Sequence, residues 1–576
     1  MVKKTSANQV GTLTLAVVIL CIIALKIFTS LTKATGNDYY SHLQPSTDPT
    51  SDRTSALLTA WYFSKMTSPW STTTLLNYPE GESIFRWQEL TQLFQIGILF
   101  LFSKICSPSI SVSLLTLVGL SLSCFSLYRL TKVLTTNQVA GMFAPIVLLL
   151  SPYTDRIIST HTSESFLGLS VLSLSYAFEI NNKNNVKIFI KMYFALVFVA
   201  IVDGYYFLFS LFATFILIAC QLARYCLRRK YPPKYLTMSL LVLVAHFMIV
   251  KALSTYLQKK GSANAQIASL DSILSHKADT NYLWLGNVHT FFFGEYLTYR
   301  PTGPVIGMFA LGVTIIGFLK FRYRLFDIAI VTMVLQVLGT YSSPRNPLTQ
   351  ITATLKTLFP GVLYYSRFTH VVFCLTVSMY VYVIYQASQS WKTRMSKVRI
   401  SNTSKKMSAI LVVTVMVTLV MYDWSGERDR FKYYVQERPQ VYQSLSATIA
   451  GNGTAIFPLD IFGRSHIEQF YLQTNLANSK RRPEELQDIW NRAISTKSIK
   501  KELLSESIRF LILFSRNENS SGEYVFSWER DGGDEVIIDL PELEANIESR
   551  FPVLIYGQKI YVNLFDLQKS NPENLD

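Results

Sequence analysis

A succession of apolar stretches constrains this chain most, because each is close to the roughly 20 residues that a helix needs to cross a bilayer. A chain built this way buries its apolar surface in lipid. Eleven such spans are predicted, near 11–30, 111–128, 137–151, 162–180, 189–206, 207–223, 235–256, 304–320, 325–341, 368–386 and 408–423. The sequence therefore predicts a polytopic α-helical membrane protein whose first span is a retained signal anchor.

One further apolar stretch, Leu93–Phe102, is too short to span alone, and Lys104 and Pro108 follow it closely. We interpret it as a re-entrant or interfacial helix on the outer face. If this stretch did span, every later loop would change sides and the C-terminal part would lie in the cytoplasm.

The distribution of charge predicts the orientation. The net charge is +16, but residues 424–576 hold 18 basic against 23 acidic residues, so the remainder carries +21. This excess lies in alternate loops, namely Arg129 and Lys132, Lys183 to Lys191, Arg224–Lys234, Lys320–Arg324 and Lys392–Lys406. Cytoplasmic loops of membrane proteins are enriched in Lys and Arg, so these loops and the N-terminus are predicted to lie inside. The charge thus reports topology, and no motif supports a nucleic-acid partner.

Three long segments are then left on the outer face, at 31–90, 257–303 and 341–367, and segments of this length usually carry function. After the membrane module, 1–423, residues 424–576 are predicted to form a small α/β or α+β extracytoplasmic domain. Its predicted elements are strands at Thr454–Pro458, Ile508–Phe514, Tyr524–Trp528, Val536–Leu540 and Leu554–Phe565, and a helix at Arg482–Ala493.

The first outer segment contains the candidate catalytic residue, Asp38, a few residues after the first span. A carboxylate at the membrane surface can act as a general base on a hydroxyl group. The alternative is a solvated loop in which aspartates cap short helices. Further carboxylates of the same segment are Asp48, Asp52, Glu80 and Glu82.

Other polar residues are predicted on the same face. His161 and Glu164 are three residues apart and share a helical face, and the alternative role for them is an interfacial cap. Arg300 and Arg367 each precede a span, where arginine can grip a phosphate with two hydrogen bonds or can extend to ordinary lipid headgroups. Asp203 lies where two spans meet, as in the turn of a helical hairpin. The remaining candidates for binding a phosphorylated ligand are His42, Arg86 and Tyr365.

Several short motifs run in order through the membrane part: Gly36-Asn-Asp38-Tyr-Tyr-Ser-His42, Leu76-Asn-Tyr-Pro-Glu-Gly-Glu82, Leu127-Tyr-Arg-Leu-Thr-Lys132, Leu150-Ser-Pro-Tyr153 with His161, Asp203-Gly-Tyr-Tyr206 and Tyr365-Ser-Arg-Phe368. Together they resemble the bacterial multi-span glycosyltransferases of the GT-C superfamily that have a C-terminal extracytoplasmic domain.

The resemblance implies a polyprenyl-phosphate or polyprenyl-diphosphate sugar donor, used on the outer membrane face, and inverting transfer to a glycan, lipid or protein acceptor. It implies that Asp38 is the base and that Arg300, Arg367 and His161 hold the donor phosphate. The first outer segment lacks the adjacent acidic pair of some relatives, so a divalent metal remains an open alternative, with Asp48, Asp52, Glu80 or Glu82 as the second carboxylate. A second hypothesis is a non-catalytic or flippase-like protein of the same fold that handles polyprenyl lipids. A transporter is disfavoured because the polar residues gather on one face and not at the midplane.

Overall fold

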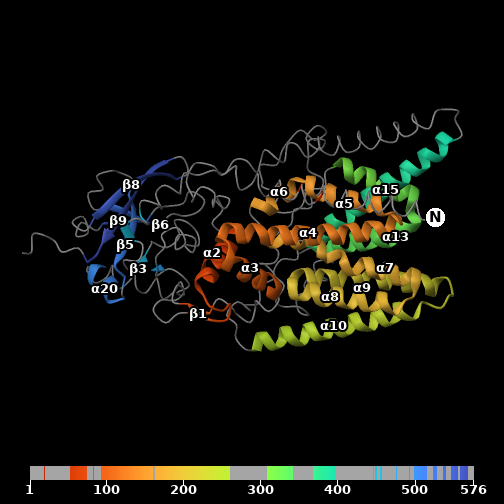
Figure 1. Ribbon diagram of the computed structural model, residues 1–576, viewed down its shortest axis with the longest axis horizontal. Helices are drawn as coiled ribbons and strands as arrows, with labels where there is room; N and C mark the ends of the chain where they lie inside the picture. The colour runs from red at the N-terminus through yellow and green to blue at the C-terminus, as the bar shows by residue number, and fades with distance from the viewer. Residues whose placement is uncertain are drawn as a thin grey trace, which may run out of the picture.

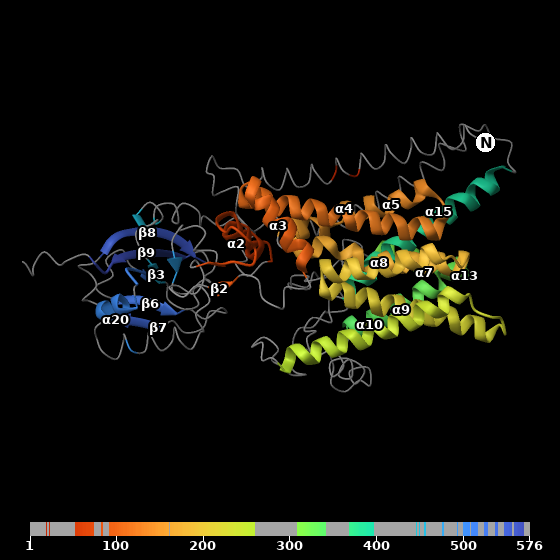
Figure 2. The same cartoon turned by 60° about the horizontal axis from the view of Figure 1, so that its bottom comes forward.

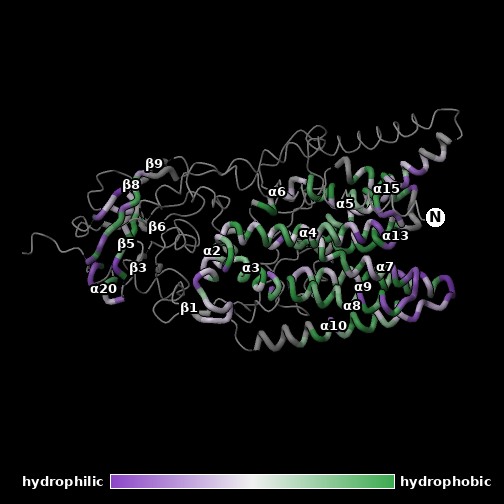
Figure 3. Tube along the Cα trace, viewed as in Figure 1, coloured by the Kyte–Doolittle hydropathy of each residue, from purple (hydrophilic) through white to green (hydrophobic). Residues whose placement is uncertain are grey.

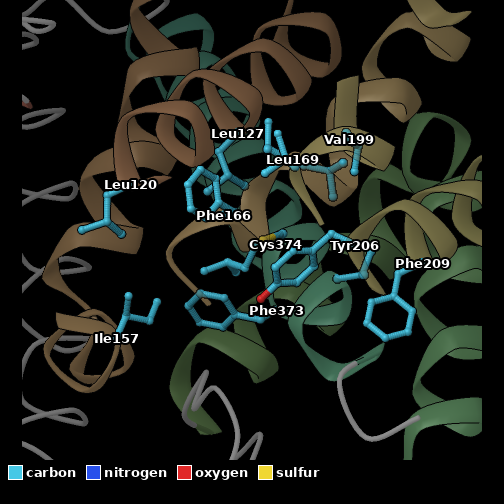
Figure 4. Packing of buried hydrophobic residues seen from close by; sticks show 14 of the residues in the cluster. Leu120, Leu127, Ile157, Phe166, Leu169, Val199, Tyr206, Phe209, Phe373 and Cys374 are labelled. Carbon is cyan, nitrogen blue, oxygen red and sulfur yellow. The ribbon is translucent and has the colours of Figure 1, made fainter. Parts of the chain in front are cut away.

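The computed structural model describes residues 52–73, 82–83, 92–159, 162–259, 308–340, 368–396, 454–456, 475–476, 499–506, 508–515, 523–527, 536–539, 547–555 and 558–568, and the single residues 19, 22, 445, 448, 449 and 492. In this part of the chain, long helices run side by side along the longest axis, and a β-sheet lies at one end of that axis (Figures 1 and 2). The apolar core joins the helices α4, α7, α8, α9 and α15, whose bounds follow, and part of it is drawn in Figure 4.

Most predicted spans coincide with helices: α4 (Pro108–Thr135), α5 (Gln138–Leu150), α8 (Val186–Val202), α9 (Gly204–Leu227), α10 (Lys234–Lys259) and α15 (Phe368–Ser396). Among the described residues, three helical stretches are long and apolar enough to cross a membrane: Pro108–Thr135, Gly204–Leu227 and Phe368–Trp391. The spans predicted at 11–30 and 408–423 lie outside the described residues, except that Ile19 and Ile22 are helical. The predicted helical architecture with apolar spans is therefore confirmed for the described residues, whereas the total of eleven spans and the bounds of the module stay predictions.

A tight turn at Asp203 joins α8 to α9, as the sequence predicted. The Asp203 side chain is buried and accepts hydrogen bonds from the backbone N–H groups of Tyr205 and Tyr206, at 2.8 and 3.1 Å. This is an N-terminal helix cap, which supplies acceptors for N–H groups that have no partner inside the helix. Gln95 of α3 (Leu93–Ile105) donates from Nε2 to the Val202 carbonyl at 2.8 Å, so the end of α8 is also satisfied.

One pair of predicted spans is not separated as expected. The segments 304–320 and 325–341 belong to one helical element, α13 (Met308–Thr340), which continues through the basic residues Lys320–Arg324. The predicted loop between them was wrong, because this segment contains neither glycine nor proline to end a helix.

The span predicted at 162–180 consists of two kinds of helix. It begins as a 3₁₀ helix, η3 (Thr162–Val171), and continues as α7 (Leu172–Lys183). The helix η3 crosses α4 closely, because Ser123 donates from Oγ to the Ser165 carbonyl at 2.6 Å and accepts from the Gly168 N–H at 2.9 Å. A Cβ atom on Gly168 would lie only 2.6 Å from Ser123 backbone atoms, so this crossing requires glycine.

Two of the loops predicted to be cytoplasmic, 183–187 and 228–234, lie together at one end of the bundle. The Tyr235 N–H donates to Asn184 Oδ1 at 3.2 Å, which joins loop 183–187 to loop 228–234. Two ion pairs bring other helices to the same end: Arg129 of α4 pairs with Glu179, and Arg224 of α9 pairs with Asp327 of α13. Hydrophilic residues cluster there in Figure 3. We call loops 183–187 and 228–234 the basic end; the compartment that it faces stays a prediction.

Among the described residues of the C-terminal part, seven strands form one sheet: β3 (Thr454–Ile456), β4 (Asn475–Leu476), β5 (Phe510–Ser515), β6 (Glu523–Ser527), β7 (Val536–Asp539), β8 (Ile547–Ile555) and β9 (Gln558–Asp566). The central strand β5 pairs antiparallel with β9 along its whole length, and β8 lies beyond β9. On its other edge β5 meets β3 in parallel at its start and β6 antiparallel at its end. The helix α20 (Ile499–Ser505) precedes it.

The mixed sheet fits the predicted α/β or α+β class, with one correction. The strand predicted at Leu554–Phe565 is the end of β8 and most of β9, because Ile555 pairs with Gln558 across a two-residue connection. The helix predicted at Arg482–Ala493 lies outside the described residues, except that Arg492 is helical. That this region forms a separate extracytoplasmic domain stays a prediction.

Candidate functional site

Four helical elements bring polar side chains together inside the bundle. Tyr153 comes from α6 (Pro152–Ser159), Glu164 from η3, Tyr206 from α9 and His370 from α15. None of the four is more than 3% exposed. We call these four residues the His370 cluster. Ionisable side chains inside a membrane bundle are rare and usually functional, which makes this cluster the candidate site.

The contacts of the His370 cluster form a continuous hydrogen-bond chain. The Tyr153 hydroxyl lies 2.5 Å from Glu164 Oε2 and 3.0 Å from His370 Nε2. On the other side of the imidazole, the Tyr206 hydroxyl lies 3.3 Å from Nδ1. A second oxygen of the carboxyl group, Glu164 Oε1, is 3.8 Å from His370 Nε2.

The donors in this chain follow from the chemistry of the groups. An ionised Glu164 only accepts, so Tyr153 donates to it and its oxygen accepts from an N–H on His370 Nε2. In the neutral imidazole, Nδ1 then accepts from Tyr206. When the ring is protonated, it forms an ion pair with Glu164 instead. The Tyr153 hydroxyl thus bridges the Glu164 carboxyl group and the His370 imidazole.

Aromatic side chains enclose the cluster. The Tyr153 ring lies 5.8 Å from that of Phe373, and Phe368 packs at 4.4 Å on Phe209. Tyr206, Phe209 and Phe373 are seen in this core in Figure 4. Because the surroundings are apolar, loss of either Glu164 or His370 would leave the partner buried and uncompensated, a change that typically costs about 3–5 kcal/mol. The pair thus fixes the relative positions of η3 and α15.

Three helices begin at this cluster, since Glu164, Tyr206 and His370 are each the third residue of their element. The N-terminal end of a helix carries partial positive charge and favours anions, and at α9 the Asp203 carboxylate already fills this place. Two hydroxyl groups beside Glu164, those of Thr162 and Ser165, are buried without a hydrogen-bond partner among the described residues. The Ser165 hydroxyl lies against Gly119 of α4, inside the crossing of η3 and α4.

The structure brings together some predicted residues and leaves others undescribed. Glu164 joins the cluster, and Asp203 caps α9 one turn from Tyr206. Asp52 is the first residue of α2 (Asp52–Lys65), and Glu82 begins β2 (Glu82–Ser83), which pairs with β1 (Thr72–Thr73). The candidates outside the described residues are Asp38, His42, Asp48, Glu80, Arg86, His161, Arg300, Tyr365 and Arg367.

The described residues contain no group of three side chains able to hold a metal ion. This leaves the predicted divalent metal untested, because the carboxylates proposed for it come from the first outer segment, whose side chains are not described at those positions.

Tyr153, Tyr206 and His370 were not among the predicted site residues. A signal was present, because Tyr153 and Tyr206 end two of the motifs quoted above and His370 follows a third by two residues. Their contacts join positions as far as 217 residues apart, and no local pattern reveals such a contact.

No protein-family model and no curated protein matches the sequence. The chain is similar to solved structures, among them the archaeal oligosaccharyltransferase AglB from Archaeoglobus fulgidus, in complex with an inhibitory peptide and a dolichol-phosphate. That similarity has 9% identity and a TM-score of 0.47, over 91% of this chain and 75% of the other.

Two further similarities have 12% identity each. ArnT from Cupriavidus metallidurans in the apo state has a TM-score of 0.45, over 95% of this chain and 97% of that one. The arabinofuranosyltransferase AftD from Mycobacteria has a TM-score of 0.44, over 96% of this chain and 42% of that one. At TM-scores below 0.5, the similarities assign no activity to this chain.

Proposed function

We propose that this chain is a membrane glycosyltransferase that moves a sugar from a polyprenyl-phosphate or polyprenyl-diphosphate donor to an acceptor on the extracytoplasmic face. The observation that carries the proposal is the His370 cluster, a buried acid–imidazole network where three helices begin. It lies at the opposite end of α9 from the basic end. An anionic lipid phosphate at this end would meet the positive ends of η3 and α15, because Asp203 already caps α9.

Two of the predicted phosphate ligands directly precede the elements that meet in the cluster. His161 is the residue before η3 and Arg367 is the residue before α15. The contact between Glu164 and His370, each three residues further on, holds the starts of these two elements together. In this scheme His161 and Arg367 bind the donor phosphate, and Glu164 and His370 are positioning residues that set their spacing.

The proposed reaction is inverting. Asp38 removes the proton from the acceptor hydroxyl as its oxygen forms a bond to the anomeric carbon of the sugar. The bond between that carbon and the phosphate oxygen breaks, and its electron pair stays on the departing phosphate. Arg300, Arg367 and His161 stabilise the charge that develops there. His42, Arg86 and Tyr365 are further donor ligands, and a divalent metal held by Asp48, Asp52, Glu80 or Glu82 is an open addition.

The test uses the full chain reconstituted in liposomes with a radiolabelled polyprenyl-phosphate sugar and a total membrane-glycan extract as acceptor. Asp38→Asn is expected to insert and to bind polyprenyl phosphate normally while transfer is lost. Asp271→Asn is the matched control, because it removes a carboxylate of another outer segment, 257–303, and it is expected to keep transfer. Near-normal transfer by Asp38→Asn would overturn the base assignment.

A second measurement separates the two functional hypotheses. If the wild-type chain binds polyprenyl phosphate but transfers no sugar from any donor of this class, the chain handles lipid without catalysis. In that case Arg367→Gln should still weaken polyprenyl-phosphate binding, because the phosphate site at the start of α15 would be shared by both functions.

A further inference from the structure

The basic end carries more exposed cations than its fold requires. The exposed basic residues of the basic end and of the adjoining part of α8 are Lys183, Lys187, Lys191, Arg228, Arg229, Lys230 and Lys234. The two loops of the basic end are held side by side, because the Tyr235 N–H donates to Asn184 Oδ1 at 3.2 Å and the rings of Phe189 and Tyr235 lie 5.9 Å apart. The two loops therefore form one charged surface.

The carboxylates at this end are already engaged. Glu179 pairs with Arg129, and Asp327 pairs with Arg224. Of the seven exposed cations, Lys183 forms an ion pair within the described part of the chain: its Nζ lies 3.9 Å from Glu179 Oε1. The described part of the chain thus leaves a surplus of positive charge on this surface.

The positions of two lysines are unfavourable for the helices that carry them. Lys187 and Lys234 stand in the first turns of α8 and α10, and neither first turn contains an acidic residue. Cations at the N-terminal end of a helix are opposed by the helix dipole, whereas cations at the C-terminal end, such as Arg224 of α9, are stabilised. An anion bound from outside the chain would offset the unfavourable interaction between each lysine and its helix dipole.

Exposed apolar side chains flank the cations. Leu227 is 86% and Tyr231 is 99% exposed, within the same loop region as Arg228 and Lys230. Aromatic residues mixed with Lys and Arg are typical of the membrane–water boundary. Below them, α8 and α10 expose apolar side chains such as Phe194 and Leu241, as a lipid-facing surface requires. The charged surface therefore lies at headgroup depth.

We propose that the basic end binds the phosphate groups of anionic phospholipids, of the phosphatidylglycerol type. Basic surfaces between helices at a membrane boundary attract such lipids, and the apolar side chains beside the cations favour a lipid over a soluble acidic partner. The site is separate from the His370 cluster, at the other end of α9, and it holds whether or not the chain transfers sugar.

The test measures lipid retention by native mass spectrometry on the full chain, purified in a neutral detergent with equal amounts of dioleoyl-phosphatidylglycerol and dioleoyl-phosphatidylcholine. The wild type is expected to retain several-fold more phosphatidylglycerol, and high salt should reduce this preference. The triple variant Lys187→Gln, Lys230→Gln, Lys234→Gln should lose it. Measurement in detergent makes the result independent of membrane orientation.

Two control variants complete the test. The variant Lys65→Gln, Lys500→Gln, Lys501→Gln removes the same charge from other surfaces and should retain the preference. The variant Lys187→Arg, Lys230→Arg, Lys234→Arg keeps the charge and should retain it as well. Equal retention of the two lipids by the wild type, or an undiminished preference in the glutamine variant at the basic end, would overturn the proposal.

Discussion

Replacement of Gly168 by alanine tests whether the crossing of η3 and α4 positions the His370 cluster. The new Cβ would lie 2.6 Å from the Cα and carbonyl oxygen of Ser123, which are backbone atoms and cannot rotate away. The helices must therefore separate, and the hydrogen bonds of Ser123 with Ser165 and Gly168 would be lost. Since Glu164 precedes Ser165 in η3, its contact with His370 should lengthen too.

The magnitude follows from three contributions. Overpacking of this kind costs about 1–3 kcal/mol, and each lost hydrogen bond about 1 kcal/mol. The higher helix propensity of alanine offsets at most about 1 kcal/mol of this destabilisation. We expect a net destabilisation of about 3 kcal/mol, seen as a lower Tm of the purified protein in detergent, and a loss of sugar transfer.

The matched control is Gly97→Ala in α3, where a Cβ would meet nothing within 4 Å. This variant should be neutral or stabilised by at most about 1 kcal/mol. If both variants melt at the wild-type temperature and transfer sugar at the wild-type rate, then the η3–α4 crossing does not depend on close backbone contact and the reasoning fails.

Three further substitutions test other parts of the structure. Glu164→Gln keeps an acceptor for Tyr153 but removes the charge facing His370. The rate of sugar transfer should fall by at least about tenfold, a barrier increase of about 1.4 kcal/mol, while the fold is retained. An unchanged rate at saturating donor would contradict the positioning role. Asp203→Ala removes the cap of α9 and should cost about 1 kcal/mol in thermal unfolding, most of which Asp203→Asn should restore. Gln95→Leu leaves the Val202 carbonyl without its donor and should cost about 1–3 kcal/mol; a Tm equal to that of the wild type would mean that another group replaces the amide.

The helical part of the fold was largely predictable, because hydropathy alone determines where a chain can cross lipid. Asp203 between two apolar runs indicated the α8–α9 turn, and the structure has it there. The predicted loop at Lys320–Arg324 was wrong, because charge marks the membrane boundary but does not end a helix. The turn between β8 and β9 was missed, because a single glycine, Gly557, is the main turn signal between two strand-like runs.

The candidate site was predictable only in part. Glu164 was identified from its spacing to His161, but its partner His370 lies more than 200 residues away and enters from another helix. Such contacts depend on how helices pack, and side-chain packing in a bundle is not encoded in any local period. The same holds for Tyr153 and Tyr206. Each ends a short sequence motif, but neither motif predicts that its tyrosine contacts His370.

The 3₁₀ form of η3 also determines how far Glu164 lies along the bundle axis and in which direction its side chain points. Ten residues at a rise of about 2.0 Å extend about 20 Å, whereas an α-helix of the same length extends about 15 Å. Over the seven steps from Val171 to Glu164, the tighter winding carries Glu164 about 3.5 Å further along the bundle axis than an α-helix would. It also turns each residue by about 120° instead of about 100°, which over the seven steps from Val171 to Glu164 amounts to about 140°. Rewinding η3 as an α-helix would thus both withdraw the carboxylate and point it away from His370, so the depth and aim of this one acid depend on the winding of a single segment.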